Sequence, residues 1–171
     1  MQLSEELTTA MNRQVGHELA ASSQYIAIAA HFDVQALSRL ADFFYRQSDE
    51  EREHAMKFVH FIVEAGGALE IPVVPAPTSR FASAAEAVAL AVASEERVTR
   101  QIYALMDQAK SDSDYIAQRF LDWFVDEQFE EMSTMGDLLQ VVERAGEDQL
   151  LRVEEYLERG GPEGPTGGEE E

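Results

Sequence analysis

The chain has 171 residues, of which 45% are hydrophobic, and its formal net charge is −20. This length and composition are typical of one globular domain with an apolar core. The excess of acidic residues disfavours nucleic acid as a partner, because its phosphates would be repelled. The absence of cysteine excludes disulfides, a cysteine nucleophile and thiolate metal sites, so a bound metal would need carboxylate, imidazole or amide ligands.

The N-terminal segment MQLSEELTTAMN reads as an amphipathic helix and lacks the basic and apolar regions of a signal peptide. No apolar run approaches the length of about 18 residues that would span a bilayer. We therefore expect a cytoplasmic protein with no membrane partner.

The first half of the chain predicts a helical hairpin. Its apolar periodicity runs over residues 3–32, breaks at HFDVQALS, and resumes over residues 37–65. The pair Gly66 and Gly67 then predicts a C-terminal cap. The segment IPVVPAPTSR that follows contains three prolines, so we expect an extended crossover there and no helix.

The second half predicts another hairpin. Ser83 with Glu86 forms a potential capping box for a third helix that runs to about Lys110. The SDSD cluster predicts a turn into a fourth helix, which ends near residues 145–146, and EDQLLRVEEYLERGG predicts a short fifth helix. Four long helices with one long connection in the middle indicate an all-α four-helix bundle with a single crossover.

Each long helix carries an apolar seam, in steps of three and four residues, that polar residues interrupt near its middle. One interruption has little meaning in a chain so rich in glutamate, but four interruptions at matching places indicate a common cause. The interrupting residues are, in chain order, Gln14, Glu18, Gln47, Glu51, His54, Glu95, Gln128 and Glu131.

Counting from the turns predicts that these groups converge. Glu18 and Glu51 are equidistant from the first turn, and Glu95 is as far from the SDSD turn as Gln128 or Glu131. Residues equidistant from the turn of an antiparallel hairpin face one another, here at roughly 25 Å from each turn, given a rise of about 1.5 Å per residue. Both hairpins therefore place their polar groups at one level of the core.

This layer would contain four carboxylates, those of Glu18, Glu51, Glu95 and Glu131. Such groups lose hydration and repel one another when buried, unless protons or cations neutralise them. Two divalent cations would balance four negative charges, which indicates a dinuclear metal site. Glu51 and His54 lie on adjacent turns of one helix face, so both can reach one metal.

An oxygen-rich site with a single imidazole favours iron or manganese over zinc. The alternative is that these groups bond only to one another or to water in a wet bundle core.

The sequence resembles the prokaryotic non-haem ferritins, which are cage-forming iron-storage proteins with ferroxidase activity. The resemblance extends through the fifth helix and rests on the motifs HELAASSQY, EEREH, SEERVTRQ and EQFEE. It implies a ferritin-like bundle with a short fifth helix over residues 1–159, followed by a flexible acidic tail over residues 160–171. It also implies a homo-oligomer, a cage of 24 subunits, that oxidises Fe(II) with O2 or peroxide and stores the ferric mineral.

Under this resemblance, Glu18, Glu51 and His54 would bind a first iron. Glu51 as a bridge, Glu95 and either Gln128 or Glu131 would bind a second. Glu50, Glu127 and Glu130, with Glu131 shared, match a third iron site found in such ferritins. Tyr25 and Trp123 would lie near the site, where a role in electron transfer or hydrogen bonding competes with simple core packing.

Two departures separate the chain from related families. Bacterioferritins have a second ExxH motif on the fourth helix and a methionine haem ligand, whereas this chain has Gln128 to Glu131 and Arg52 at those places, so we expect no haem. The miniature ferritins that protect DNA divide their site between subunits, whereas this chain carries a complete set.

Two other functions remain open at the level of sequence. One is a different oxygen-activating di-iron oxidase or peroxidase on the same bundle, although the absence of cysteine excludes a rubrerythrin. The other is a metal-free structural bundle. His17, His31 and His60 fall outside the seams and are interpreted as surface or interface residues.

Overall fold

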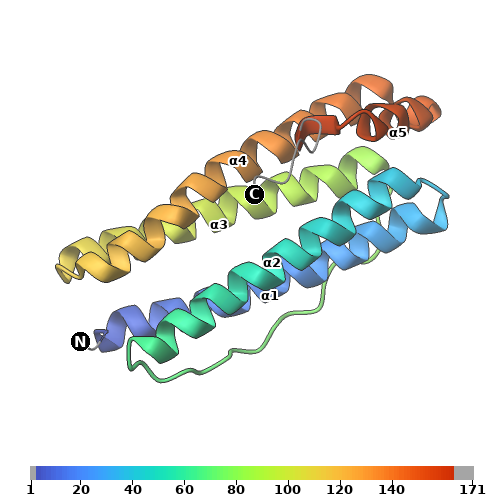
Figure 1. The fold of residues 1–171 in the computed structure, drawn as a ribbon. Coiled ribbons are helices and arrows are strands. Elements are labelled where there is room, and N and C mark those ends of the chain that lie inside the picture. The colour runs from blue at the N-terminus through green and yellow to red at the C-terminus, as the bar shows by residue number, and fades with distance from the viewer. Residues whose placement is uncertain (1–2, 164–171) are drawn as a thin grey trace, which may run out of the picture.

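The computed structural model describes residues 3–163, which form five α-helices and contain no strand. Two antiparallel hairpins lie side by side, and the fifth helix packs at one end of the bundle (Figure 1). The predicted all-α four-helix bundle with one crossover and a short fifth helix is confirmed. The helices are α1 (Glu5–Val34), α2 (Ser38–Glu64), α3 (Ala84–Ser111), α4 (Tyr115–Ala145) and α5 (Leu150–Glu158), with short 3-10 turns η1 (Glu147–Gln149) and η2 (Gly161–Glu163).

Serine side chains cap the N-termini of α1 and α3. The side chain of Ser4 accepts a hydrogen bond from the N–H of Leu7 at 3.1 Å, so α1 begins two residues later than its apolar periodicity predicts. Ser83 accepts from the N–H of Glu86 at 3.0 Å, as the predicted capping box requires. The carboxylate of Glu86 reaches back one residue further than in the usual box, to the N–H of Ala82.

The end of α2 is the predicted glycine cap. Gly66 has a φ of +76°, a conformation that favours glycine. The N–H of Gly67 bonds to the carbonyl of Ile62 at 2.8 Å, and that of Gly66 to the carbonyl of Val63 at 3.1 Å, which together form a Schellman motif. The chain therefore leaves α2 sharply and enters the crossover.

Two helix starts are capped by carboxylates from near the C-terminal end of the bundle. No side chain next to the start of α2 caps it; Glu154 of α5 accepts hydrogen bonds from the N–H groups of Arg39 and Leu40 instead, both at 2.9 Å. Glu147 accepts from the N–H of Ala84 at 2.8 Å, at the start of α3. These bonds attach the α5 region to both hairpins.

The crossover between α2 and α3 runs along α1. The side-chain amide of Asn12 makes two hydrogen bonds of 2.8 Å to the crossover backbone, one as donor and one as acceptor, and Gln24 does the same further along. Between them Gly16 lies under Pro72, where an added Cβ would come within 2.3 Å of the proline ring. The lack of a side chain at Gly16 thus allows the crossover to lie directly on α1.

The apolar core consists of two clusters, one in each half of the bundle. Tyr25, Phe32 and Phe44 belong to the cluster near the α1–α2 turn, and Phe58 and Phe124 to the other. The polar seam residues lie between the two clusters along every long helix. In the part of the chain that the structure describes, no helix combines the length and the apolar character that crossing a membrane requires.

The predicted tail over residues 160–171 falls mostly outside the described residues, since these end at residue 163. Its first residues include the 3-10 turn η2, which lies against α4 and α5. The division between domain and tail at residue 159 stays a prediction.

Candidate metal centre

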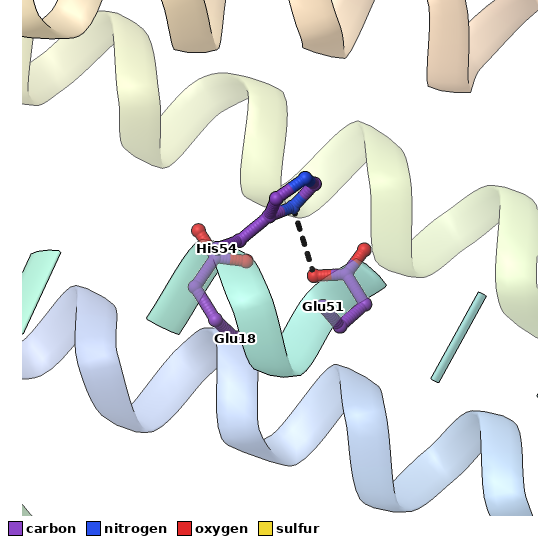
Figure 2. A group of neighbouring side chains, drawn as sticks. All are labelled: Glu18, Glu51 and His54. Carbon is purple, nitrogen blue, oxygen red and sulfur yellow. Dashed lines mark ion pairs between the residues drawn. The ribbon is translucent and has the colours of Figure 1, made fainter. Parts of the chain in front are cut away.

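The structure brings the polar seam residues into the centre of the bundle. Glu18 comes from α1, while Glu51 and His54 come from adjacent turns of α2 and extend toward the second hairpin (Figure 2). One ligand atom from each of these three side chains lies within 4.8 Å of the other two. All three are buried, with at most 3% of each residue exposed.

The second hairpin completes the layer with Glu95 from α3 and two residues of α4, Gln128 and Glu131, which are also buried. The amide nitrogen of Gln128 donates a hydrogen bond to the carboxylate of Glu95 at 3.1 Å. The hydroxyl of Tyr25 donates to the same carboxylate. The convergence predicted by counting from the turns is therefore present in the fold.

Burial raises the pKa of every carboxyl group in this layer. It raises the pKa of Glu18 to about 7 and that of Glu131 to about 9, with the charge of Glu95 contributing to both shifts. The pKa of Glu51 is raised well above its ordinary value by burial and by the charges of Glu95 and Glu18. The pKa of Glu95 is also raised by burial. Without cations, the layer therefore retains protons at neutral pH.

His54 is held as a neutral imidazole, because burial lowers its pKa to about 4. Its Nδ1 atom lies 3.6 Å from a carboxylate oxygen of Glu51, the contact dashed in Figure 2. A neutral ring at this distance forms neither an ion pair nor a good hydrogen bond. One ring nitrogen of a neutral imidazole carries a lone pair, and this is the form of histidine that binds metals.

Several ligand atoms in this layer have no hydrogen-bond partner. Among the described residues, six buried side-chain oxygen or nitrogen atoms are unpartnered; five of them belong to polar seam residues, and four of these five are on carboxylate or imidazole side chains. Buried polar atoms in native proteins are normally paired, so this concentration requires an explanation. Metal coordination supplies one. The four atoms are Oε2 of Glu18, Oε2 of Glu51, Nδ1 of His54 and Oε2 of Glu131.

The residues matched to a third iron site lie beside this layer and are more exposed. Glu50 and Glu127 are half-buried and Glu130 is exposed. Burial and the charge of Glu130 raise the pKa of Glu127, and the charges of Glu50 and Glu127 contribute to the raised pKa of Glu131. The four carboxylates thus interact electrostatically. Within residues 3–163, however, the one group of three or more acidic or histidine side chains close enough to share a metal is Glu18, Glu51 and His54.

Trp123 lies next to the centre, as expected, but it is 40% exposed. Its ring meets the ring of His54 edge to face at 5.4 Å, and the Nζ atom of Lys57 lies 4.4 Å from its centroid. The exposed position makes core packing alone a poor explanation of this side chain.

Three residues that sequence reasoning did not assign to the site support its ligands. Gln14 donates to Glu18 at 2.9 Å. Gln47 donates to Glu50 at 2.6 Å. Their places in the apolar seams, one turn before Glu18 and Glu51, were the signal that could have identified them.

Thr99 is the third supporting residue. Its hydroxyl donates to the backbone carbonyl of Glu95 at 2.8 Å, and its oxygen lies 3.3 Å from the amide nitrogen of Gln128. Because the hydroxyl proton is used by Glu95, the oxygen can serve only as an acceptor for Gln128. The amide nitrogen is held toward α3, and the amide oxygen remains free. A threonine one turn after a glutamate carries no clear signal in the sequence.

Comparison with known proteins gives the same family at three levels. A family model described as Ferritin, a ferritin-like domain, matches residues 8–145. The Ferritin BfrB of Mycobacterium tuberculosis is 38% identical over 149 residues, which are 87% of this chain and 82% of that protein. The Bacterial non-heme ferritin of Staphylococcus haemolyticus is 38% identical over 146 residues, 85% of this chain and 88% of that protein.

The fold has the same relatives. A solved structure of an open pore ferritin from the hyperthermophilic archaeon Archaeoglobus fulgidus superposes with a TM-score of 0.88 at 32% identity, and the match covers 91% of this chain and 98% of that one. With the family model, the relatives and the fold in agreement, this chain belongs to the ferritin family of iron-storage proteins and, within it, to the prokaryotic ferritins.

Proposed function

We propose that the chain is a ferroxidase subunit that oxidises Fe(II) to Fe(III) and delivers the ferric product to a store. The observation that carries the proposal is the set of four buried ligand atoms without hydrogen-bond partners, gathered in one polar layer between two apolar clusters. Membership of the ferritin family supports iron as the substrate.

In this proposal Glu18, Glu51 and His54 bind the first ferrous ion. Glu51 also bridges to the second ion, which Glu95 binds together with Gln128 or Glu131. The hydrogen bonds from Tyr25 and Gln128 to Glu95 support this assignment, because they fix the orientation of that carboxylate. Each ion sits in a mainly oxygen-based site, which suits iron.

Ferrous ions replace protons on the carboxyl groups when they bind. With the pKa of Glu18 near 7 and that of Glu131 near 9, binding of ferrous ions must displace protons from the layer. Two ferrous ions then give one electron each to dioxygen, which takes up two protons and becomes hydrogen peroxide. If peroxide is the oxidant, the same two electrons and two protons break its O–O bond and yield two waters. The carboxylates stabilise the ferric charge that results.

Glu50, Glu127 and Glu130 would bind iron as it leaves or enters the dinuclear site, with Glu131 shared. Their greater exposure supports a transient role, since exposed carboxylates exchange ions with solvent more readily than buried ones do. Tyr25, hydrogen-bonded to Glu95, would supply an electron or steady that ligand.

We further propose that the chains assemble into a cage of 24 copies without haem, and that the store lies inside it. The relatives named ferritin support an assembly of this kind. Arg52 stands where bacterioferritins have their methionine haem ligand, which supports a haem-free protein. The cytoplasmic location remains a prediction.

The proposal is tested by anaerobic titration of the metal-free protein with ferrous iron, followed by admission of air while ferric absorbance is recorded. We expect a fast phase that saturates at two or three irons per chain, followed by slower growth with more iron. The variant Glu51→Ala/His54→Ala should lose the fast phase while keeping its helical circular dichroism.

Two outcomes would contradict the proposal. Oxidation no faster than in a protein-free control would indicate a structural bundle or a site for another metal. A double variant as fast as the parent would show that the chemistry occurs elsewhere in the protein.

A further inference from the structure

A cavity lies between α1, α3 and the crossover. It is lined by residues of α1, α3 and the crossover residues 72–77, it is open to solvent, and its volume is about 500 Å³, within the range of small-molecule sites. We refer to it as the crossover cavity. Its floor is largely apolar, and its charged or titratable lining residues are Arg13, His17 and Arg97.

The lining is unusual for so acidic a chain. The protein has 33 acidic and 13 basic residues, yet none of the described residues that line the crossover cavity is acidic. The neighbouring cavity between α1 and α3, of about 740 Å³, shares Arg13 and His17 but also contains Glu5 and Glu6. The absence of carboxylates is thus a local property of the space beneath the crossover.

The two arginines in this cavity lack carboxylate partners. Among residues 3–163, no carboxylate oxygen lies within 4.0 Å of the guanidinium of Arg13 or Arg97. The hydrogen bond that Arg97 makes is a long one, 3.4 Å to the hydroxyl of Ser94, which also lines the cavity. Burial lowers the pKa of His17, and the charges of Arg97 and Arg13 lower it further, so all three groups act on the same space.

The cavity also contains an unpartnered amide. The side-chain oxygen of Gln101 is buried without a hydrogen-bond partner, and Gln101 lines the cavity beside Arg97. A glutamine amide carries both an acceptor oxygen and a donor NH2 group, so Gln101 adds a third kind of donor to the lining. The site therefore offers guanidinium, hydroxyl and amide donors but no carboxylate to compete for them.

Such a donor set matches the chemistry of an oxyanion. Guanidinium groups bind phosphate and carboxylate oxygens with two parallel hydrogen bonds. The net charge of −20 repels anions at long range, but at physiological salt this repulsion is screened beyond about 8 Å. The charged side chains that line the cavity, those of Arg13 and Arg97, are positive and exposed.

We propose that the crossover cavity binds one small oxyanion, of the phosphate or carboxylate class, between Arg13 and Arg97. This site is separate from the proposed oxidation of iron and does not depend on it.

The test is calorimetric titration of the assembled, metal-free protein with inorganic phosphate at constant ionic strength set by chloride. A second arm uses citrate, which distinguishes a phosphate site from a carboxylate site. We expect saturable binding of one anion per chain in at least one arm, and affinity at least tenfold weaker in Arg13→Gln/Arg97→Gln. Arg100→Gln is the matched control, because Arg100 lies on α3 outside the cavity lining and should bind like the parent.

The proposal is overturned if neither anion gives saturable binding, or if the double variant and the control bind equally. It is also overturned if the double variant fails to assemble and the parent shows no saturable site, because the arginines would then pair with carboxylates of a neighbouring copy. Size-exclusion chromatography of all variants separates this outcome from a loss of anion binding. The fast phase of iron oxidation serves as a check on the fold and should be unchanged in the double variant.

Discussion

The apolar ends of the bundle and the polar layer between them are built from the same four helices but have opposite relations to stability. At the ends, buried rings such as Phe32 and Phe44 stack with centroids 5.8 Å apart, and their burial favours folding. In the layer, buried carboxyl groups have raised pKa values and unpartnered oxygens, so their burial opposes folding in the absence of cations. The apolar ends thus stabilise the fold, whereas the polar layer offers ligands that cations would neutralise.

The largest effect is expected for Glu51→Gln in the polar layer. This variant keeps the shape of the side chain but replaces the carboxylate of the proposed bridging ligand with a neutral amide. We expect the fast phase of iron oxidation to slow by about a hundredfold or more, because replacing a supporting residue alone can cost about 10- to 100-fold. The thermal midpoint of the metal-free protein should stay level at neutral pH, since the raised pKa of Glu51 already keeps its carboxyl group protonated there and glutamine has the same shape. Glu53→Gln, an exposed neighbour on α2, should change neither quantity.

The converse change is Phe32→Ala in the apolar cluster near the α1–α2 turn. Phe32 is fully buried, and its truncation should cost about 3–5 kcal/mol of stability. In a chain of this size that corresponds to a lowering of the thermal midpoint by roughly 6–20 °C. The oxidation rate per folded chain should remain within about twofold of the parent. Val34→Ala, at a side chain 91% exposed, should leave the midpoint almost unchanged.

A pH series gives a smaller effect of predictable sign. Because the folded-state pKa values of Glu18 and Glu131 lie above the ordinary value of 4.5, their protonated forms stabilise the fold at low pH, and this contribution is lost as pH rises toward about 7 and about 9. His54 has the opposite dependence, but its pKa is lowered from 6.5 to about 4, so its contribution is constant above pH 6.5. The thermal midpoint of the metal-free protein should therefore fall between pH 6.5 and 8.5.

Glu131→Gln is the control for that series. Because the pKa of Glu131 is the one raised to about 9, its removal should flatten the decline of the midpoint above pH 7. A midpoint that rose with pH in the parent, or a decline unchanged in the variant, would mean that the layer carries charge in the metal-free protein.

The smallest expected effect concerns Thr99, which orients Gln128. Thr99→Val keeps the shape but removes the acceptor for the amide, so the amide oxygen is no longer directed away from α3. We expect a severalfold weaker second binding step for Co(II), measured spectroscopically as an inert probe of both sites, with the first step unchanged. Thr99→Ser should restore the second step. Equal weakening of both steps would point to a general loss of packing instead.

The apolar periodicity, together with the capping and turn residues, predicts most of the fold, because the residues responsible are close together in the chain. The Ser83 cap and the Gly66 turn depend on contacts within a few residues, and the sequence predicts both. The level of the polar layer was also predictable, since Glu18 and Glu51 are related by simple counting across a turn.

Other features depend on contacts between distant residues, for which local patterns contain no information. The bonds from Glu154 to the start of α2 join residues more than a hundred positions apart. The crossover cavity depends on where Pro72 passes over α1 relative to Arg97 on α3. Phe129 shows another limit, because it is an aromatic residue directly after the buried Gln128 of α4 and is nevertheless 79% exposed.

The capping of α2 and α3 by Glu154 and Glu147 has a consequence for how the chain is made. The residues that complete the starts of these two helices follow both hairpins in the chain, so they are synthesised after them. A nascent chain that ends before residue 147 can form its hairpins, but two helix N-termini remain without their carboxylate partners. Synthesis of η1 and α5 therefore supplies the carboxylates that hold the two hairpins in their final arrangement.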